Sequence, residues 1–139
     1  MARIEARIAN RWDEMQAIAR MVEGFGAEHR VPRAIVNDLN VALDEALNNI
    51  ISYGYEPGER SDIMVRLTSA AGEIVVEIVD AGRPFDPLQA PAPDLSGSLR
   101  ERNVGGLGIH FIKNLVDEVT YDRIAGHNRL RLRKRLVVG

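Results

Sequence analysis

The amino-acid sequence predicts an α+β fold, a two-layer sandwich in which helices cover one face of a mixed, mostly antiparallel β-sheet. Some short stretches alternate apolar and polar residues, as half-buried strands do, whereas two longer stretches repeat their apolar residues every three or four positions, as amphipathic helices do. The predicted strands also occur in groups. A sheet built from such groups must cover its apolar face with helices, which favours two layers.

The first strand and the first helix follow from a change of period. Residues 3–9 alternate apolar and charged side chains, which predicts a strand. From about Asp13 the apolar residues recur at helical spacing, and we expect Gly24 and Gly26 to end this helix.

A second helix and a hairpin come next. Pro32 suits the start of the helix, whose broad apolar stripe continues to about Gly54 and predicts a well-buried element. The alternating stretches 63–67 and 74–78 then predict two strands. The short connection at 70–72, with its glycine, favours a hairpin.

The last third of the chain is irregular at first and regular at its end. Residues 83–104 carry four prolines and predict a long loop, and loops of this length in compact domains are usually functional. A short helix is expected to begin near Gly106, and two strands over about 116–123 and 128–137. There is no linker or repeat, so we expect a single domain over residues 1–139.

Composition excludes several classes of function. The 139 residues include 45% hydrophobic residues and no cysteine, so disulfides and thiolate sites are excluded and a core is expected. The net charge of −2 indicates neither nucleic acid nor an anionic membrane as a partner. The basic run 129–135 is interpreted as the solvent face of an edge strand. No secretory signal or apolar run long enough to cross a bilayer is visible, so a cytoplasmic protein is expected.

Two polar residues interrupt the most apolar helix. Glu45 and Asn49 are four positions apart, so they project from the same helix face. A carboxylate and an amide oxygen are ligands that Mg²⁺ accepts together with water and phosphate oxygens, and a carboxylate near a phosphate can accept a proton. The ordinary alternative is a polar edge of a partly exposed helix.

A second polar segment follows the strand at 74–78. Asp80 can accept a hydrogen bond from an amino group such as the exocyclic amine of adenine. Gly82 would let the chain turn and approach a flat ligand closely. The ordinary alternative is a strand-ending turn, since Asp and Gly both favour turns.

A glycine-rich segment precedes the short helix. Gly105, Gly106, Leu107 and Gly108 place backbone amides at a helix start, where phosphate oxygens are attracted. The segment has neither the spacing of a Rossmann fingerprint nor the Lys-Ser or Lys-Thr of a Walker A loop. A plain glycine-rich cap is the alternative.

In this order and at these separations the three segments resemble the nucleotide-binding motifs of GHKL-superfamily ATPases. Residues 44–51 resemble the N box, residues 80–87 resemble the box that follows it, and residues 105–109 resemble the glycine-rich box. Within that superfamily, the chain most resembles the anti-sigma-factor serine/threonine protein kinases. The features that carry this resemblance are its small size, the sequence Phe85-Asp86-Pro87 and the run 114–119. The resemblance implies the GHKL, or Bergerat, ATP-binding fold.

The resemblance also implies a role for each candidate residue. Asn49 would coordinate Mg²⁺ and bind the nucleotide, and Glu45 would be the general base for phosphoryl transfer. Asp80 would bind the adenine amine in a pocket that Gly82 shapes. Gly105, Gly106, Leu107 and Gly108 would hold the phosphates of ATP, under a lid formed by residues 87–104.

The function implied is that of a protein serine kinase in a partner-switching system. In the family, ATP phosphorylates a serine of a small anti-anti-sigma partner of the STAS fold; the unphosphorylated partner competes with a sigma factor for the kinase, and homodimers are usual. An alternative is an ATP-binding module that sequesters a partner without kinase activity. A sensor histidine kinase fits less well, because no helical hairpin with a phospho-accepting histidine is recognisable.

Overall fold

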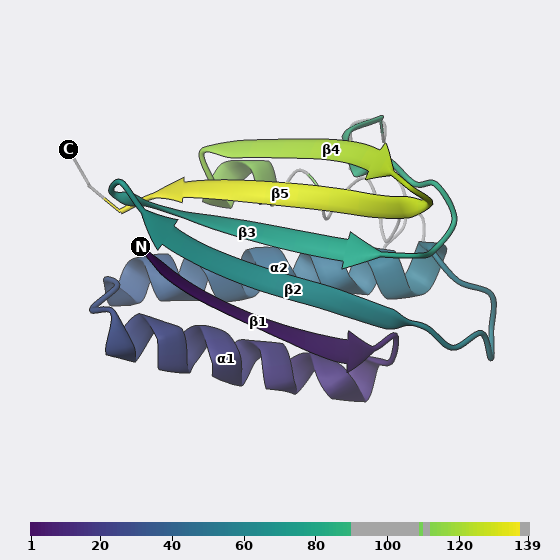
Figure 1. Cartoon of the computed structure of the whole chain (residues 1–139), viewed down its shortest axis with the longest axis horizontal. Coiled ribbons are helices and arrows are strands. Elements are labelled where there is room, and N and C mark those ends of the chain that lie inside the picture. Colours follow the sequence, from purple (N-terminus) through teal and green to yellow (C-terminus); the bar gives the residue numbers. More distant parts are fainter. Residues whose placement is uncertain (90–108, 110–111, 137–139) are drawn as a thin grey trace, which may run out of the picture.

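The structure, a computed structural model, describes residues 1–89, 109 and 112–136. A five-stranded sheet carries two long helices side by side on one face and leaves the other face open (Figure 1). This arrangement confirms the predicted two-layer α+β sandwich. The elements are β1 (Ala2–Ala9), η1 (Trp12–Glu14), α1 (Met15–Glu28), α2 (Arg33–Tyr53), β2 (Asp62–Ala70), β3 (Glu73–Asp80), η2 (Pro87–Gln89), β4 (Glu118–Ile124) and β5 (His127–Arg135).

The strand order is β1-β2-β3-β5-β4, and every pairing in the described part of the chain is antiparallel. Two hairpins are closed by two-residue turns in which both residues have positive φ: 54° and 76° at Ala71 and Gly72, and 52° and 79° at Ala125 and Gly126. Turns with this geometry match the twist of antiparallel strands. The hairpin predicted around residues 70–72 is therefore confirmed.

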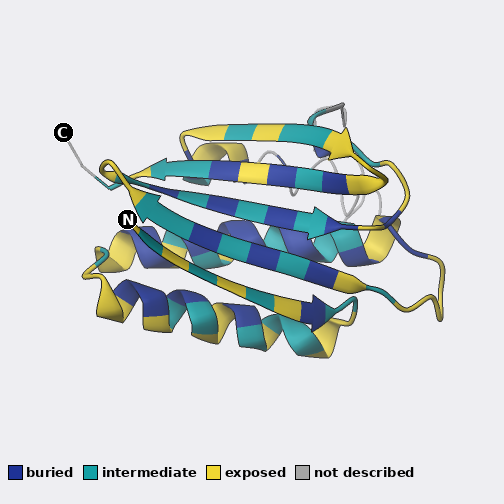
Figure 2. Ribbon diagram, in the orientation of Figure 1, coloured by how far each residue is buried: buried dark blue, intermediate teal, exposed yellow. Residues whose placement is uncertain are grey.

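The core lies between the sheet and the helices. Inward-facing residues of the central strands alternate with outward-facing ones, so buried and partly exposed positions form bands along β2, β3 and β5 (Figure 2). Helix α2 contributes the largest share of buried helical residues, as its broad apolar stripe predicts. They are Ile35, Val36, Leu39, Ala42, Leu43, Ala46, Leu47 and Ile51.

The prediction that Gly24 and Gly26 end the first helix was wrong. Helix α1 continues through both glycines to Glu28. A Cβ on Gly26 would lie 2.5 Å from Cγ2 of Val36 in α2. This glycine therefore allows the two helices to approach closely, which is a packing role that local helix-ending preferences do not reveal.

The basic run 129–135 lies on an interior strand, so the edge-strand interpretation was wrong. Strand β5 pairs with β3 on one side and β4 on the other, and β4 is the edge. The arginines do face the open side of the sheet, as predicted, where they pair with acidic residues of neighbouring strands. Arg129 contacts Asp122, and Arg133 contacts Glu73.

The short helix before β4 is present in the described residues 109 and 112–115. Ile109 and Ile112 are both 1% exposed, so this helix packs into the core as its apolar spacing predicts. None of the helices in the described part of the chain is both long enough and apolar enough to cross a membrane.

Candidate functional site

The C-terminal half of α2 supplies one wall of the candidate site. Glu45 and Asn49 lie one turn apart on this helix, as predicted, and Tyr53 continues the same face at its last turn. The ring of Tyr53 stacks on Phe85, with centroids 5.6 Å apart. The stack joins the end of α2 to the segment that follows β3.

Asp80 is the last residue of β3 and is 3% exposed. Its Oδ1 accepts hydrogen bonds from the backbone N–H of Gly82 at 2.9 Å and from Nδ2 of Asn128 at 3.1 Å. Burial raises the pKa of the Asp80 carboxyl, and the hydrogen bonds from Asn128 and Gly82 offset part of that rise. A carboxylate held at such a place by neutral donors keeps acceptor capacity for a ligand.

Gly82 lies where the segment after β3 touches the end of α2. A Cβ there would come within 2.7 Å of the backbone oxygen of Gly54 and 2.9 Å of Oδ1 of Asp80. The same Gly54 oxygen accepts a hydrogen bond from the backbone N–H of Arg83 at 2.9 Å. This close backbone approach requires a glycine whatever ligand is bound, and the role of Gly82 in an adenine pocket stays a prediction.

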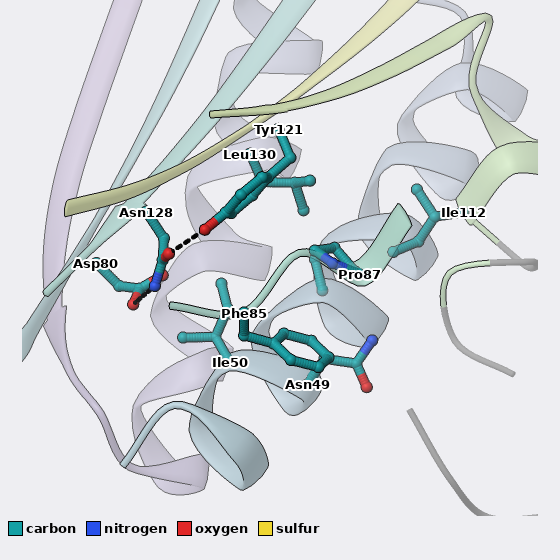
Figure 3. A pocket seen from close by; sticks show the side chains of 10 residues that line it. Asn49, Ile50, Asp80, Phe85, Pro87, Ile112, Tyr121, Asn128 and Leu130 are labelled. Atoms are coloured by element: carbon teal, nitrogen blue, oxygen red, sulfur yellow. Dashed lines mark hydrogen bonds between the residues drawn. The ribbon is translucent and has the colours of Figure 1, made fainter. Parts of the chain in front are cut away.

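A pocket between the helix layer and the sheet brings these elements together (Figure 3). Figure 3 shows Asp80 and Asn128 at one end and Asn49 at another, with Phe85 between them. The pocket is partly open to solvent, and its cavity volume is about 20 Å³, roughly the space of one water molecule. The lining residues are Ala46, Asn49, Ile50, Asp80, Phe85, Pro87, Ile112, Tyr121, Asn128 and Leu130.

The lining is mostly apolar, with a few polar groups, which is the usual composition of a small-ligand site. Aliphatic and aromatic side chains suit a flat ring, and the Asp80 carboxylate suits an amine on that ring. Phe85 lies on the irregular segment that follows β3, and Pro87 begins the short helix η2. These two residues form the part of the pocket wall that belongs neither to the sheet nor to the two long helices.

Asn49 carries a polar atom with no partner. Its buried Nδ2 has no hydrogen-bond partner in the described part of the chain. Buried amides are normally paired, so an unpaired one at a pocket is available to a ligand. Within the described residues no three His, Cys, Asp or Glu side chains could hold a metal ion together. The unpaired Nδ2 is a donor suited to a phosphate oxygen, whereas only the amide oxygen of Asn49 could bind a hard cation such as Mg²⁺ beside water and phosphate oxygens.

Glu45 lies beside the pocket and does not line it. Burial raises the pKa of the Glu45 carboxyl, and the neighbouring Asp44 carboxylate adds to the rise. A carboxylate with a raised pKa is a stronger base than a fully exposed one. The environment of Glu45 is consistent with the predicted base, whose role stays a prediction.

Several site residues were not among those predicted. Asn128, Tyr121 and Phe85 line the pocket, and Arg123 bonds to Asn128. The pairing of β3 with β5 places Asn128 directly opposite Asp80, and an asparagine among the alternating apolar residues of a strand was the available clue. Gly105, Gly106, Leu107 and Gly108 lie outside the described residues, as does residue 90 onward of the predicted lid, 87–104.

Comparisons with known proteins concern the family and the fold of the chain. Residues 8–134 match the model of the histidine kinase-like ATPase domain family. The chain is 36% identical over 94 residues to the serine/threonine-protein kinase BtrW of Bordetella bronchiseptica, covering 68% of this chain and 66% of BtrW. It is 28% identical over 117 residues to an anti-sigma F factor of Clostridium beijerinckii, and the match covers 82% of this chain and 80% of that factor. The match thus spans just under two thirds of BtrW.

A solved structure shows the same fold. The RsbU and RsbW domains of Rv1364c from Mycobacterium tuberculosis match with a TM-score of 0.70 at 17% sequence identity, covering 98% of this chain and 33% of that one. At this identity the likeness concerns the fold alone.

Proposed function

The chain belongs to the histidine kinase-like ATPase domain family, and on that premise we propose that it is an ATP-dependent protein serine kinase. ATP binds in the pocket between α2 and the ends of β3 and β5, and its γ-phosphoryl group passes to a serine of a protein partner. The likeness to BtrW, a protein named as a serine/threonine kinase, supports this choice among the activities of the family.

One observation carries the proposal. A single pocket contains a buried carboxylate, Asp80, and a helix-borne amide, Asn49; among the described residues the carboxylate has no arginine partner and the amide nitrogen has no partner. Asp80 is suited to the exocyclic amine of adenine, and Asn49 is suited to the metal-bound phosphate end. A nucleotide needs both kinds of contact at the two ends of one apolar pocket.

Each candidate residue has a separate role in the proposed phosphoryl transfer. Asp80 orients the base, and the apolar lining excludes water from it. Glu45 accepts the proton of the partner's serine hydroxyl as its oxygen bonds to the γ-phosphorus, and the bond from that phosphorus to the leaving oxygen of ADP breaks. The amide oxygen of Asn49 would hold Mg²⁺ together with water and phosphate oxygens, and the ion would supply charge neutralisation. Gly105, Gly106, Leu107 and Gly108 are proposed to donate their backbone N–H groups to the phosphates.

The proposed partner is a STAS-domain anti-anti-sigma protein, with a sigma factor as the competing partner. The likeness to a protein named as an anti-sigma F factor supports this pairing. A homodimer acting in the cytoplasm is the proposed form.

The test is phosphoryl transfer from γ-labelled ATP to a STAS-domain protein of the same organism. Wild type is expected to label a serine, and Glu45→Gln to lower the rate by about 10²–10⁴-fold, the usual contribution of a general base. Affinity for ADP should stay near that of wild type. Asp44→Asn, at the adjacent exposed position, is the matched control and should keep most of the rate. Equal rates for Glu45→Gln and wild type would remove Glu45 as the base.

A second candidate function is an ATP-binding module that sequesters its partner without phosphorylating it. The observation that favours it is the place of Glu45, which lies outside the set of residues that line the pocket. A stable, ADP-dependent complex with the STAS protein, with no label transferred by wild type, would select this function over the kinase.

A further inference from the structure

We propose that Asn128 is a positioning residue of the nucleotide site. It holds Asp80 by one carboxylate oxygen so that the other oxygen is left for the amine of the base, and Tyr121 and Arg123 fix Asn128 in the orientation that does this. The identity of the ligand rests on the proposed function, whereas the hold on Asp80 can be measured without any ligand.

The register of the sheet brings these residues together. Asn128 pairs with Asp80 across β3 and β5, and with Arg123 across β5 and β4. Asn128 is 6% exposed and, with Asp80, is one of two buried polar or charged residues in the described part of the chain. Two buried polar side chains placed opposite each other in a sheet otherwise filled with apolar residues need a reason beyond packing.

The amide of Asn128 has a single orientation that satisfies its neighbours. Its Oδ1 accepts hydrogen bonds from the Tyr121 hydroxyl and from Nη1 of Arg123, the latter at 3.0 Å. Its Nδ2 donates to Oδ1 of Asp80 at 3.1 Å and to the backbone oxygen of Arg83 at 2.9 Å. The reversed amide would turn its NH₂ toward two donors and its oxygen toward two acceptors, so the donors on β4 determine that Asn128 presents NH₂ to Asp80.

The consequence for Asp80 is an uneven use of its two oxygens. Both hydrogen bonds that it accepts from the described residues, those from Gly82 and Asn128, go to Oδ1. Oδ2 receives neither. Because Asp80 also lines the pocket, we infer that Oδ2 is the oxygen that a ligand reaches.

The charged groups around Asp80 do not take the place of the hydrogen bond from Asn128. Arg123 and His127 lie near enough to lower the pKa of Asp80, and the Asp80 carboxylate contributes to a raised pKa of Tyr55. However, Arg123 bonds to Asn128 and to the backbone oxygens of Gly82 and Gly126 rather than to the carboxylate. The neutral Asn128 thus connects the charge of Arg123 to Asp80 without closing a salt bridge that a ligand would have to break.

The test compares three variants of the hydrogen-bond network around Asn128. Asn128→Leu keeps the approximate volume and removes the donor; Asn128→Thr restores a short hydroxyl donor; Tyr121→Phe removes one of the two donors that orient the amide. We expect ADP affinity to fall about ten- to hundredfold in Asn128→Leu, less in Tyr121→Phe, and to recover largely in Asn128→Thr. Arg131→Leu, on the open face of the same strand, is the matched control and should bind as wild type does.

A second readout needs no nucleotide. The pKa of the Asp80 carboxyl is followed by ¹³C NMR in the free protein, with Asp80→Asn to assign the signal. Loss of the Asn128 donor should raise this pKa, and the pH below which ADP binding is lost should rise with it. An Asn128→Leu protein that folds as wild type does, with unchanged titration of Asp80, would overturn the inference.

The two proposals fail in different ways. If wild type binds no ADP, the proposed function falls, and the titration of Asp80 alone decides the role of Asn128. If wild type binds ADP and Asn128→Leu binds it equally well with the same pH profile, the proposed function stands and the positioning role is wrong.

Discussion

Two aspartates at the sheet illustrate opposite uses of the same side chain. On the open face, Asp122 accepts hydrogen bonds from Nε and Nη2 of Arg129 at 2.9 and 2.6 Å, and this contact lowers its pKa. At the pocket, the donors that Asp80 has among the described residues are both neutral, and burial raises its pKa. Asp122 has its counter-charge within the protein, whereas Asp80 keeps acceptor capacity at a cost in stability. Under the proposed function, Asp80 uses this capacity for the nucleotide.

The largest effect is expected from Asp80→Asn. The new amide can still accept from Gly82 and Asn128, but it places an NH₂ group where the adenine amine would donate. We expect ADP affinity to fall by about a hundredfold or more, since a charge-assisted hydrogen bond is lost and two donors face each other. The melting temperature at neutral pH should not fall. A calorimetric titration and a thermal melt of the same sample check both parts, and retained affinity would contradict the account.

The next effect concerns the backbone around the pocket. Gly82→Ala forces a Cβ against the backbone oxygen of Gly54, an atom that cannot move like a side chain. We expect a loss of about 1–3 kcal/mol in the free energy of unfolding, the usual cost of overpacking. Gly24→Ala is the matched control, because no atom lies within 4 Å of its added Cβ and alanine favours a helix. Urea unfolding of both variants measures the difference; similar behaviour would contradict the packing role.

A smaller effect is expected in how the free energy of unfolding depends on pH, and it has opposite signs for the two aspartates. The folded-state pKa of Asp80 is raised, so the folded protein binds its proton more tightly than the unfolded chain does, and the resulting stability is lost as pH rises from about 3.9 through the folded-state pKa. Asp80→Asn should abolish this loss. For Asp122 the pKa is lowered, so its contribution is present above the unfolded-state pKa and is lost as pH falls. Unfolding followed across pH in wild type and both Asp→Asn variants tests the opposite signs.

The smallest effect is expected from Asp122→Asn at neutral pH. Exposed ion pairs contribute little, so the melting temperature should change only slightly. ADP affinity should equal that of wild type. A clear loss of affinity would show that the open face is coupled to the pocket and would weaken the contrast between the two carboxylates.

Local patterns in the sequence were sufficient for the elements and for the residues of one helix face. The alternation in 63–67 and 74–78 predicts β2 and β3, and the four-residue spacing of Glu45 and Asn49 predicts their shared face. Each of these inferences depends on neighbours within a few positions, where the periods of helices and strands are reliable guides.

Contacts between distant segments were not predictable in the same way. Gly26 is needed because Val36 packs against it, and the position of β5 inside the sheet depends on how the last hairpin pairs. Asn128 becomes part of the site only through the register of β5 against β3. Long-range register is set by the whole sheet, so a polar residue in one strand could not be assigned a partner from the sequence alone.

The measurement that tests the central claim most directly is a calorimetric titration of ADP, with and without Mg²⁺, into wild type and Asn49→Ala. The account predicts that wild type binds ADP more tightly with Mg²⁺ than without it, and that Asn49→Ala loses this gain while keeping the Mg²⁺-independent binding to Asp80. Absence of binding by wild type under both conditions would contradict nucleotide binding at this pocket. An undiminished Mg²⁺ effect in Asn49→Ala would contradict the assignment of Asn49.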